Sequence, residues 1–274
     1  MQRRQLFEIL DQAWCPTAIR HGATDILEAI ISRSNIYRPV QAKIFRAITD
    51  CGAERVIDLC SGGGGPWLSP PWRAALAQHS PLNVILSDKF PNQELWARLP
   101  GDSLIRSVDL SVDAAHVPEF LRGFRTIFSS FHHFGDATAC EVLGDAVRSG
   151  DGFAMAEVTS RTVRAFAIML VMPVLVWILT PRVRPLRWSR LLLTYVLPLI
   201  PMVVLFDGVV SCFRTRTPQE LLALTRGFPQ YEWTAGYAPG GWLSPVFLIG
   251  GPRPADRSEI TTIKSQGGNC GLDE

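Results

Sequence analysis

The sequence predicts an α/β fold in which a mostly parallel β-sheet is covered by helices on both faces. Five short apolar runs with the character of strands occur between residues 56 and 157, and helical stretches such as 72–78 and 137–147 separate them. Strands and helices that alternate in this way usually form the βαβ units of a parallel sheet. The second observation is a glycine-rich turn at residues 62–65, directly after the first strand, where α/β folds bind ligands.

The glycine-rich turn is the most informative segment of the chain. The apolar run 56–59 leads through Cys60 and Ser61 into four consecutive glycines. Glycine adopts backbone conformations that other residues avoid, and it has no side chain to keep a ligand from the main chain. A dinucleotide fingerprint and a phosphate loop both fail to fit, because Pro66 and Trp67 follow the glycines and no lysine lies nearby. The turn therefore predicts a nucleoside-containing cofactor of another kind.

The same segment resembles motif I of the class I S-adenosylmethionine-dependent methyltransferases, in which two apolar residues, an acid and a further apolar residue precede G-x-G-x-G. Asp58 matches the acid, Cys60 stands where the first glycine is usual, and Gly62 and Gly64 match the other two. The cysteine departs from the family pattern. It predicts that the tightest bend of the turn moves one residue toward the extra glycines.

Further segments follow in the order that this resemblance requires. An apolar run ends in Asp88, which matches the family's acid that accepts hydrogen bonds from both ribose hydroxyls. A D-A-x-x-V-P stretch that begins at Asp113 looks like the third motif, whose acid meets the adenine amino group, with Asp109 as the alternative. The resemblance implies S-adenosyl-L-methionine as the cofactor. The residues expected to bind it are Asp58, Cys60, Ser61, Gly62, Gly63, Gly64, Asp88, Lys89, Asp113, Ala114, Ser129 and Ser130.

The resemblance also implies a Rossmann-like class I methyltransferase architecture. Residues 1–50 are expected to form N-terminal lid helices, and residues 51–160 and 207–250 the methyltransferase core. Residues 161–206 are expected to form a hydrophobic helical hairpin inserted after the fifth strand. From residue 251 to 274 the chain is polar and without periodicity, which predicts a disordered tail.

Local signals predict several further elements. Four apolar residues within 6–13 share one helix face, so a helix is expected there. Thr217 and Glu220 have the spacing of a capping box at a helix start. Residues 231–234 and 245–250 look like the final antiparallel strand pair of a methyltransferase sheet. The segment between the hairpin and Thr217 is expected to be another strand or an active-site loop.

Composition limits the function. The formal net charge is only +2, which provides no basic field, and no nucleic-acid-binding motif is recognisable, so nucleic acid is not the expected substrate. The six cysteines are dispersed, with no C-x-x-C pair and no histidine at zinc spacing, which is typical of reduced thiols in the cytosol. Arg3 and Arg4 are followed by acids rather than by the apolar core of a signal peptide.

The expected insertion contains two largely aliphatic runs, 165–179 and 191–206, separated by a linker with four arginines and Trp188. Each run is shorter than the ~20 residues of a spanning helix and longer than a typical interfacial segment. Three interpretations remain open: a hairpin that dips into or crosses a membrane, a cap that lies on the interface, and buried helices of an enlarged core or a homodimer interface. Apolar residues on every side disfavour the interfacial cap, whereas the basic linker favours anionic lipid. We expect association with the cytoplasmic face of a membrane.

His132 and His133 are the candidate catalytic residues. The sulfonium of the cofactor is already activated, so methyl transfer needs mainly in-line placement of the acceptor, and a base only if the acceptor must lose a proton. The pair follows the fourth strand, on the acceptor side in this family, and a histidine pKa of ~6.5 suits proton abstraction. Adjacent residues on an extended segment point opposite ways, so one ring is expected to face the pocket. The alternative is that a ring only packs against a loop.

A metal site is conceivable, because Asp136 and Glu157 lie near the histidine pair in the expected fold. Adjacent histidines seldom converge on one ion, so no metal is expected. Glu157, Asp207 and Arg214 are lesser candidates for orienting the acceptor.

Two functions remain. The favoured one is methyl transfer to a small or lipophilic acceptor at a membrane surface, since an apolar cover over the site implies an apolar acceptor. The alternative is a membrane-anchored scaffold that keeps the fold without catalysis. The intact acids Asp58, Asp88 and Asp113 favour the enzyme.

Overall fold

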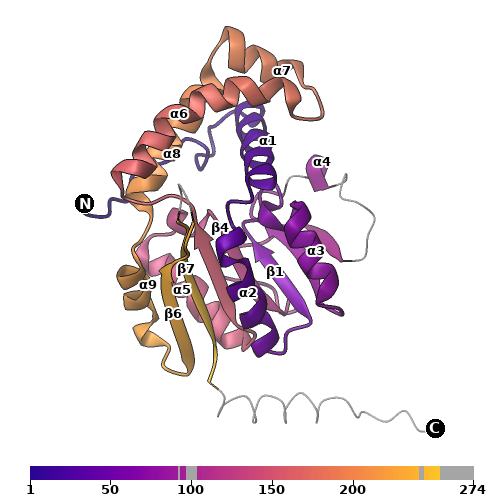
Figure 1. Ribbon diagram of the computed structural model, residues 1–274, viewed down its shortest axis with the longest axis vertical. Coiled ribbons are helices and arrows are strands. Elements are labelled where there is room, and N and C mark those ends of the chain that lie inside the picture. Colours follow the sequence, from indigo (N-terminus) through magenta and orange to yellow (C-terminus); the bar gives the residue numbers. More distant parts are fainter. Residues whose placement is uncertain (92, 97–103, 241–243, 254–274) are drawn as a thin grey trace, which may run out of the picture.

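The computed structural model describes residues 1–91, 93–96, 104–240 and 244–253. In this part of the chain seven strands form one sheet in the order β3-β2-β1-β4-β5-β7-β6, with helices on both faces (Figure 1). The strands are β1 (Arg55–Leu59), β2 (Asn83–Asp88), β3 (Ile105–Ser111), β4 (Phe124–Phe128), β5 (Phe153–Glu157), β6 (Tyr231–Tyr237) and β7 (Val246–Pro252). The α-helices are α1 (Thr17–Ser34), α2 (Arg38–Asp50), α3 (Pro70–Gln78), α4 (Gln93–Trp96), α5 (Asp136–Ser149), α6 (Val163–Leu179), α7 (Trp188–Leu191), α8 (Leu199–Arg214) and α9 (Pro218–Leu224).

The first five strands are parallel, and β7 runs antiparallel to both β5 and β6. The predicted mostly parallel sheet and the predicted final antiparallel pair are therefore confirmed. The strands alternate their side chains between two apolar layers, since Val56 and Phe128 pack with α2 and α3, while Ile57 and Met155 pack with α5 and α9. Burial on both sides explains why these strands read as nearly continuous apolar runs.

The order of the strands reverses between β1 and β4, because β1 pairs with β2 on one side and with β4 on the other. In open α/β sheets ligands bind at such a switch point, outside the carboxyl ends of the strands. The loops after β1, β2, β3 and β4 meet at this edge, and they carry the predicted site residues.

The hydrophobic insertion is helical, as expected, but its end differs from the prediction. Figure 1 shows α6, α7 and α8 gathered beyond one end of the sheet, together with α1. A π-helical segment, η4 (Leu192–Val196), links α7 to α8. The expected boundary at residues 206 and 207 falls inside α8, which continues to Arg214, so the strand or loop expected there is wrong.

The helix expected within residues 6–13 is also absent from the described residues. Residues 1–16, which we call the N-terminal strap, run instead along α8 as an irregular segment. The N–H groups of Ile9 and Leu10 donate to the Asp207 carboxylate at 2.8 and 2.9 Å, and Arg4 N–H donates to Phe213 O at 3.1 Å. These long-range partners replace the carbonyls that a helix would have supplied. Helices of the expected lid begin only with α1.

Two further predictions concern the C-terminal part. The capping box is confirmed, because the Thr217 side chain accepts from Glu220 N–H and the Glu220 side chain accepts from Thr217 N–H. The expected disordered tail cannot start at residue 251, since β7 extends to Pro252 along β6. Residues 254–274 lie outside the described residues.

Candidate active site

Asp58, at the end of β1, lies beneath the glycine-rich turn. Its side chain is 1% exposed, and its oxygens accept hydrogen bonds from Ser61 Oγ at 2.7 Å, Thr126 Oγ1 at 2.6 Å and Trp67 Nε1 at 3.1 Å. Burial raises the pKa of Asp58 to about 7, although these bonds lower it. The carboxylate is thus engaged by the protein itself and fixes the turn from below.

The turn bends at Cys60 as well as at the glycines. Cys60 has a φ of 54°, in the left-handed region that favours glycine, and Gly62 and Gly64 have φ values of 49° and 98°. Cys60 therefore shares a positive φ with the glycines that follow it, and the turn bends at both the cysteine and the glycines. A side chain at Gly64 would lie 2.5 Å from a neighbouring leucine. Ser61 and Gly63 are buried within the same turn.

Asp88, at the end of β2, contacts the glycine-rich turn directly. Its Oδ2 accepts the Gly62 N–H at 2.8 Å and its Oδ1 accepts the Phe90 N–H at 2.8 Å. Burial raises the pKa of Asp88 despite these two bonds. A carboxylate accepts about four hydrogen bonds, so each oxygen keeps a lone pair for the hydroxyls of a ligand.

Asp113, which follows β3, lies beside Lys89 just after the end of β2. Its Oδ2 lies 3.0 Å from Lys89 Nζ, and its Oδ1 accepts the Ala115 N–H at 3.0 Å. The bond from Ala115 and then the Lys89 ammonium lower the pKa of Asp113 against the effect of burial. The alternative, Asp109, is exposed within β3, and Ala114 is buried. Asp113 thus lies at the carboxyl edge of the sheet, whereas Asp109 lies within β3.

Ser129 and Ser130 follow β4 at the same edge. The Ser130 hydroxyl donates to the carbonyl of Cys60 at 3.4 Å, which ties the β4 loop to the glycine-rich turn. Ser129 has a φ of 48°, and its hydroxyl is hydrogen-bonded to the hydroxyl of Tyr37, just before α2. All twelve predicted cofactor residues thus lie at or just after the carboxyl ends of β1, β2, β3 and β4.

His132 and His133 lie in a 3₁₀ turn, Phe131–His133, rather than in an extended segment. Their rings stack with centroids 4.3 Å apart and an interplanar angle of 32°. The expectation that adjacent rings point opposite ways is therefore wrong, because it assumed a strand-like backbone. Both rings face the same group of side chains.

His132 is held by Glu157, the last residue of β5. Its Nδ1 lies 2.7 Å from Glu157 Oε2, and its backbone N–H donates to Glu157 Oε1 at 3.0 Å. Both side chains are buried, at 4% and 1% exposure. Burial opposes ionisation of Glu157, but the two bonds and the charge of His132 outweigh it, so the pKa of Glu157 is lowered. An ionised Glu157 keeps the proton of His132 on Nδ1 and directs Nε2 away from β5.

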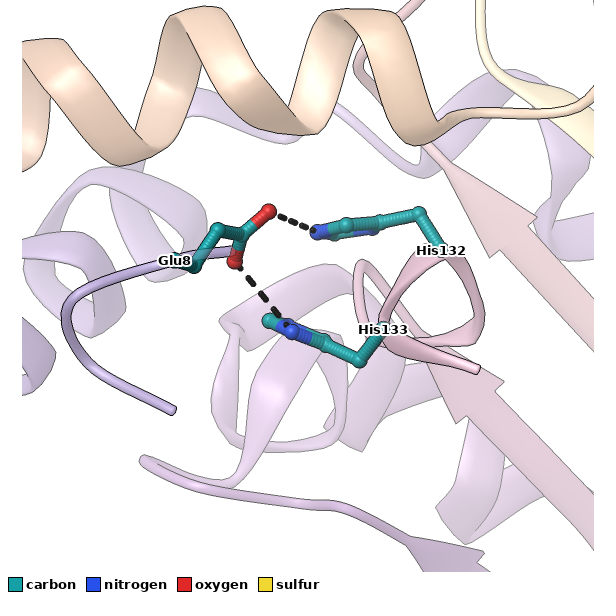
Figure 2. A group of neighbouring side chains, drawn as sticks. All are labelled: Glu8, His132 and His133. Carbon is teal, nitrogen blue, oxygen red and sulfur yellow. Dashed lines mark ion pairs between the residues drawn. The ribbon is translucent and has the colours of Figure 1, made fainter. Parts of the chain in front are cut away.

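The N-terminal strap supplies a second carboxylate, Glu8, that was not predicted from the sequence. Figure 2 shows Glu8 with one oxygen toward each histidine ring: Oε1 lies 3.5 Å from His132 Nε2 and Oε2 lies 3.2 Å from His133 Nδ1. Asp11 of the strap also approaches His133 Nδ1, at 2.9 Å. Residues about 125 positions apart in the chain thereby form one cluster.

Arg214, at the end of α8, closes the cluster. Its guanidinium lies 3.4 Å from Glu8 Oε1 and 3.1 Å from Asp11 Oδ2, and it donates to the carbonyls of His132 at 3.1 Å and His133 at 2.6 Å. Arginine forms such a fork of charged hydrogen bonds better than lysine does. Arg214 therefore holds both the strap and the histidine turn in place. Asp207, about two turns earlier on α8, accepts hydrogen bonds from the backbone of the strap.

The cluster also has the composition of a metal site. Glu8, His132 and His133 each offer one ligand atom, and these atoms lie within 4.8 Å of one another. Asp136, the further ligand considered from the sequence, pairs with two arginines instead. Glu157 binds the opposite nitrogen of His132, the position of a group that orients a ligand rather than of a ligand itself.

Glu8→Gln is expected to flatten the pH dependence of the free energy of unfolding. Burial raises the pKa of Glu8 from 4.5 to about 7, although His133 and Arg214 lower it. Between these values the folded chain keeps a proton that the unfolded chain has lost, so rising pH lowers the stability of the wild type, by up to about 3 kcal/mol. Glutamine does not titrate. Denaturant titrations near pH 5 and near pH 7.5 measure the difference, and an equal decline in both proteins would contradict it.

Comparison with known proteins supports the fold. No family model matches the chain, and no curated protein matches its sequence. The crystal structure of the plantazolicin methyltransferase BamL with SAH superposes with a TM-score of 0.50 and 8% identity, over 86% of this chain and 98% of that one. Its counterpart BpumL gives 0.47 and 10%, over 86% and 98%, and the mitomycin 7-O-methyltransferase MmcR gives 0.42 and 16%, over 76% and 53%. The likeness to BamL, with the strand order above, confirms the predicted class I methyltransferase fold.

Proposed function

We propose that this chain is an S-adenosylmethionine-dependent methyltransferase that acts on a small or lipophilic acceptor at a membrane surface. The observation that carries the proposal is the bond between Asp88 and the Gly62 N–H at the switch point, with the buried His132–Glu157 pair at the same sheet edge. A cofactor-binding edge and a proton-accepting pair thus adjoin each other.

The residues at this edge fit the cofactor. Asp88 keeps acceptor capacity for two ribose hydroxyls, and Asp113 has an ionised carboxylate for an amino group. The glycines of the turn have no side chains that would keep a ligand from the main chain. BamL, whose fold this chain shares, is a methyltransferase crystallised with SAH, which supports the same assignment. S-adenosyl-L-methionine would supply an activated methyl group here.

The histidine pair would handle the proton of the acceptor. Glu157 accepts the Nδ1–H of His132, so the nitrogen that can accept a proton is Nε2, which faces Glu8 Oε1 at 3.5 Å. Glu8 and Arg214 surround the pair, and they hold the strap over it. A buried, prearranged base of this kind contributes when the acceptor loses its proton during attack. The chain's own part is therefore to place the acceptor and to receive that proton.

Contact with a membrane is part of the proposal. Within the described residues, the segment Val163–Arg182 is long and apolar enough to cross a membrane by length and composition, with 20 residues and a hydropathy of 2.2. Only 28% of its most apolar window is buried inside the protein. An apolar surface beside the site suits an acceptor dissolved in lipid, and the cytoplasmic face fits the dispersed cysteines of the sequence, which include no C-x-x-C pair.

The test is transfer of a radiolabelled methyl group from S-adenosylmethionine into the organic-soluble fraction of lipid vesicles loaded with candidate acceptors. We expect methyl transfer that SAH inhibits. EDTA should not abolish it, because the Arg214 guanidinium already supplies the positive charge that a metal ion would add to the cluster. Binding of cofactor without transfer to any acceptor class would favour the membrane-anchored scaffold instead.

A further inference from the structure

The segment 163–206 exposes an apolar surface unlike the rest of the molecule. Of the 24 large apolar side chains that are exposed in the described residues, 15 lie in this segment. On α6 they form one stripe along the helix. The second arm of the hairpin, which begins at Trp188, continues this stripe, and its Tyr195 OH donates to Trp177 O of α6 at 2.6 Å. The stripe on α6 comprises Val163, Leu170, Val171, Val174, Trp177 and Ile178. Both faces of α6 are apolar because one packs on the protein and the other is left exposed.

The opposite face of the hairpin is fastened to α1. Val176 and Ile200 pack with Ile26 in one apolar cluster, and Gly22 approaches Ile200 so closely that a Cβ would lie 2.5 Å from it. Arg190, 1% exposed, pairs with Asp25 of α1 at 2.6 Å. A hairpin that stood across a bilayer would have to break this buried ion pair and uncover the cluster.

The return arm of the hairpin is sharply bent and ends in the active-site cluster. Its two parts, Trp188–Val196 and Leu199–Arg214, meet at an angle of 76°. The C-terminal half of α8 carries Asp207, Ser211 and Arg214 into the active-site cluster, where all three are buried and hydrogen-bonded. A spanning arm in lipid needs ~20 apolar residues without such groups.

The charge of the segment is one-sided. Residues 161–206 contain six arginines and no acidic residue, whereas the whole chain has a net charge of only +2. Arg164 lies at one end of the exposed stripe, and Arg182 and Arg184 lie at the other, all exposed. Trp188, 81% exposed, stands beside the latter pair. Arginine and tryptophan at the edges of an apolar face are typical of contact with the headgroups of anionic lipids.

We infer that the hairpin lies flat in one leaflet of an anionic membrane, with the exposed stripe of α6 and the second arm among the acyl chains. The sequence disfavoured an interfacial arrangement because neither apolar run has a polar face. In the structure α1 covers one apolar side of the hairpin, so only the other side is left to contact lipid. Resting on the proposed function, this orientation also assigns the acceptor to the membrane phase. The ring centroids of Phe7 in the strap and Phe206 lie 5.6 Å apart, and the next residue, Glu8, contacts the histidine pair. The strap therefore connects the lipid-facing hairpin with the active site.

Flotation of the full chain with phosphatidylcholine vesicles, with and without phosphatidylglycerol, tests the docking without any turnover. The wild type is expected to float with the anionic vesicles, and Arg182→Gln/Arg184→Gln to bind them about tenfold or more weakly. Leu170→Glu/Val174→Glu is expected to abolish flotation, while Leu110→Glu/Phe120→Glu, with equally exposed residues and the same charge change, keeps it. Unchanged thermal unfolding would show that the variants fold. Flotation of Leu170→Glu/Val174→Glu, or none by the wild type, would overturn the inference.

A second measurement separates a flat hairpin from a spanning one. Ser189 is exposed at the tip, so Ser189→Cys gives a reporter there, compared with the protein without it. In vesicle-bound protein an impermeant maleimide added outside is expected to label this cysteine fully. Labelling only after the vesicles are permeabilised would show a spanning hairpin and contradict the proposal. Vesicle binding without methyl transfer would leave the docking standing and count against the proposed activity alone.

Discussion

His132→Ala is expected to lower kcat by about 100-fold or more while the affinity for SAH stays within about twofold. The reason is that His132 Nε2 is the proton-accepting atom of the pair, whereas the cofactor residues lie in the loops after β1, β2 and β3. Steady-state kinetics of methyl transfer and a calorimetric titration with SAH give the two numbers. The effect is the largest that the geometry predicts for a single side chain.

Because His132 is buried, its loss could also disturb the fold, so a second variant is needed. Glu157→Gln keeps the shape of the partner but removes the charge that fixes the His132 proton on Nδ1. We expect it to reduce kcat in the same direction, and we expect His116→Ala, at an exposed histidine, to leave kcat unchanged. Full activity of both His132→Ala and Glu157→Gln would eliminate the histidine as the base.

Asp88→Ala is expected to weaken SAH binding by about tenfold or more, which corresponds to about 1.4 kcal/mol. The variant removes the acceptors of the ribose hydroxyls and also the partner of the Gly62 N–H, so the turn loses a support as well. Calorimetry measures the change. Asp109→Ala, at an exposed aspartate of β3, is the control and should bind SAH like the wild type. Equal affinities of wild type and Asp88→Ala would refute the ribose assignment.

The core of the fold was predictable because its determinants are local. Each parallel strand is a short apolar run, and the glycines indicate the first turn. Thr217 and Glu220 form a capping box within four residues. The cofactor edge followed from these, since parallel strands bring the loops after them to one side of the sheet. The positive φ of Cys60 was not predicted, because residues other than glycine rarely adopt it.

On the acceptor side, the histidine pair was predictable from the sequence, but the carboxylates of the N-terminal strap were not, because they reach the site through long-range contacts. The strap bonds to α8 across about 200 residues, so no pattern within residues 1–16 indicated that Glu8 and Asp11 would reach the histidines. The extent of α8 was missed because the apolar run ends at Phe206, whereas the helix continues through the buried polar residues Asp207, Ser211 and Arg214.

The central claim is that the glycine-rich turn and Asp88 form a site for S-adenosylmethionine. The most direct test is a calorimetric titration of the full, detergent-solubilised chain with S-adenosylmethionine and with SAH. We expect both to bind with dissociation constants in the micromolar range, which corresponds to a binding free energy of about −8 kcal/mol. A folded protein that binds neither would contradict this claim, and would leave the lipid-docking hairpin as the functional part of the chain.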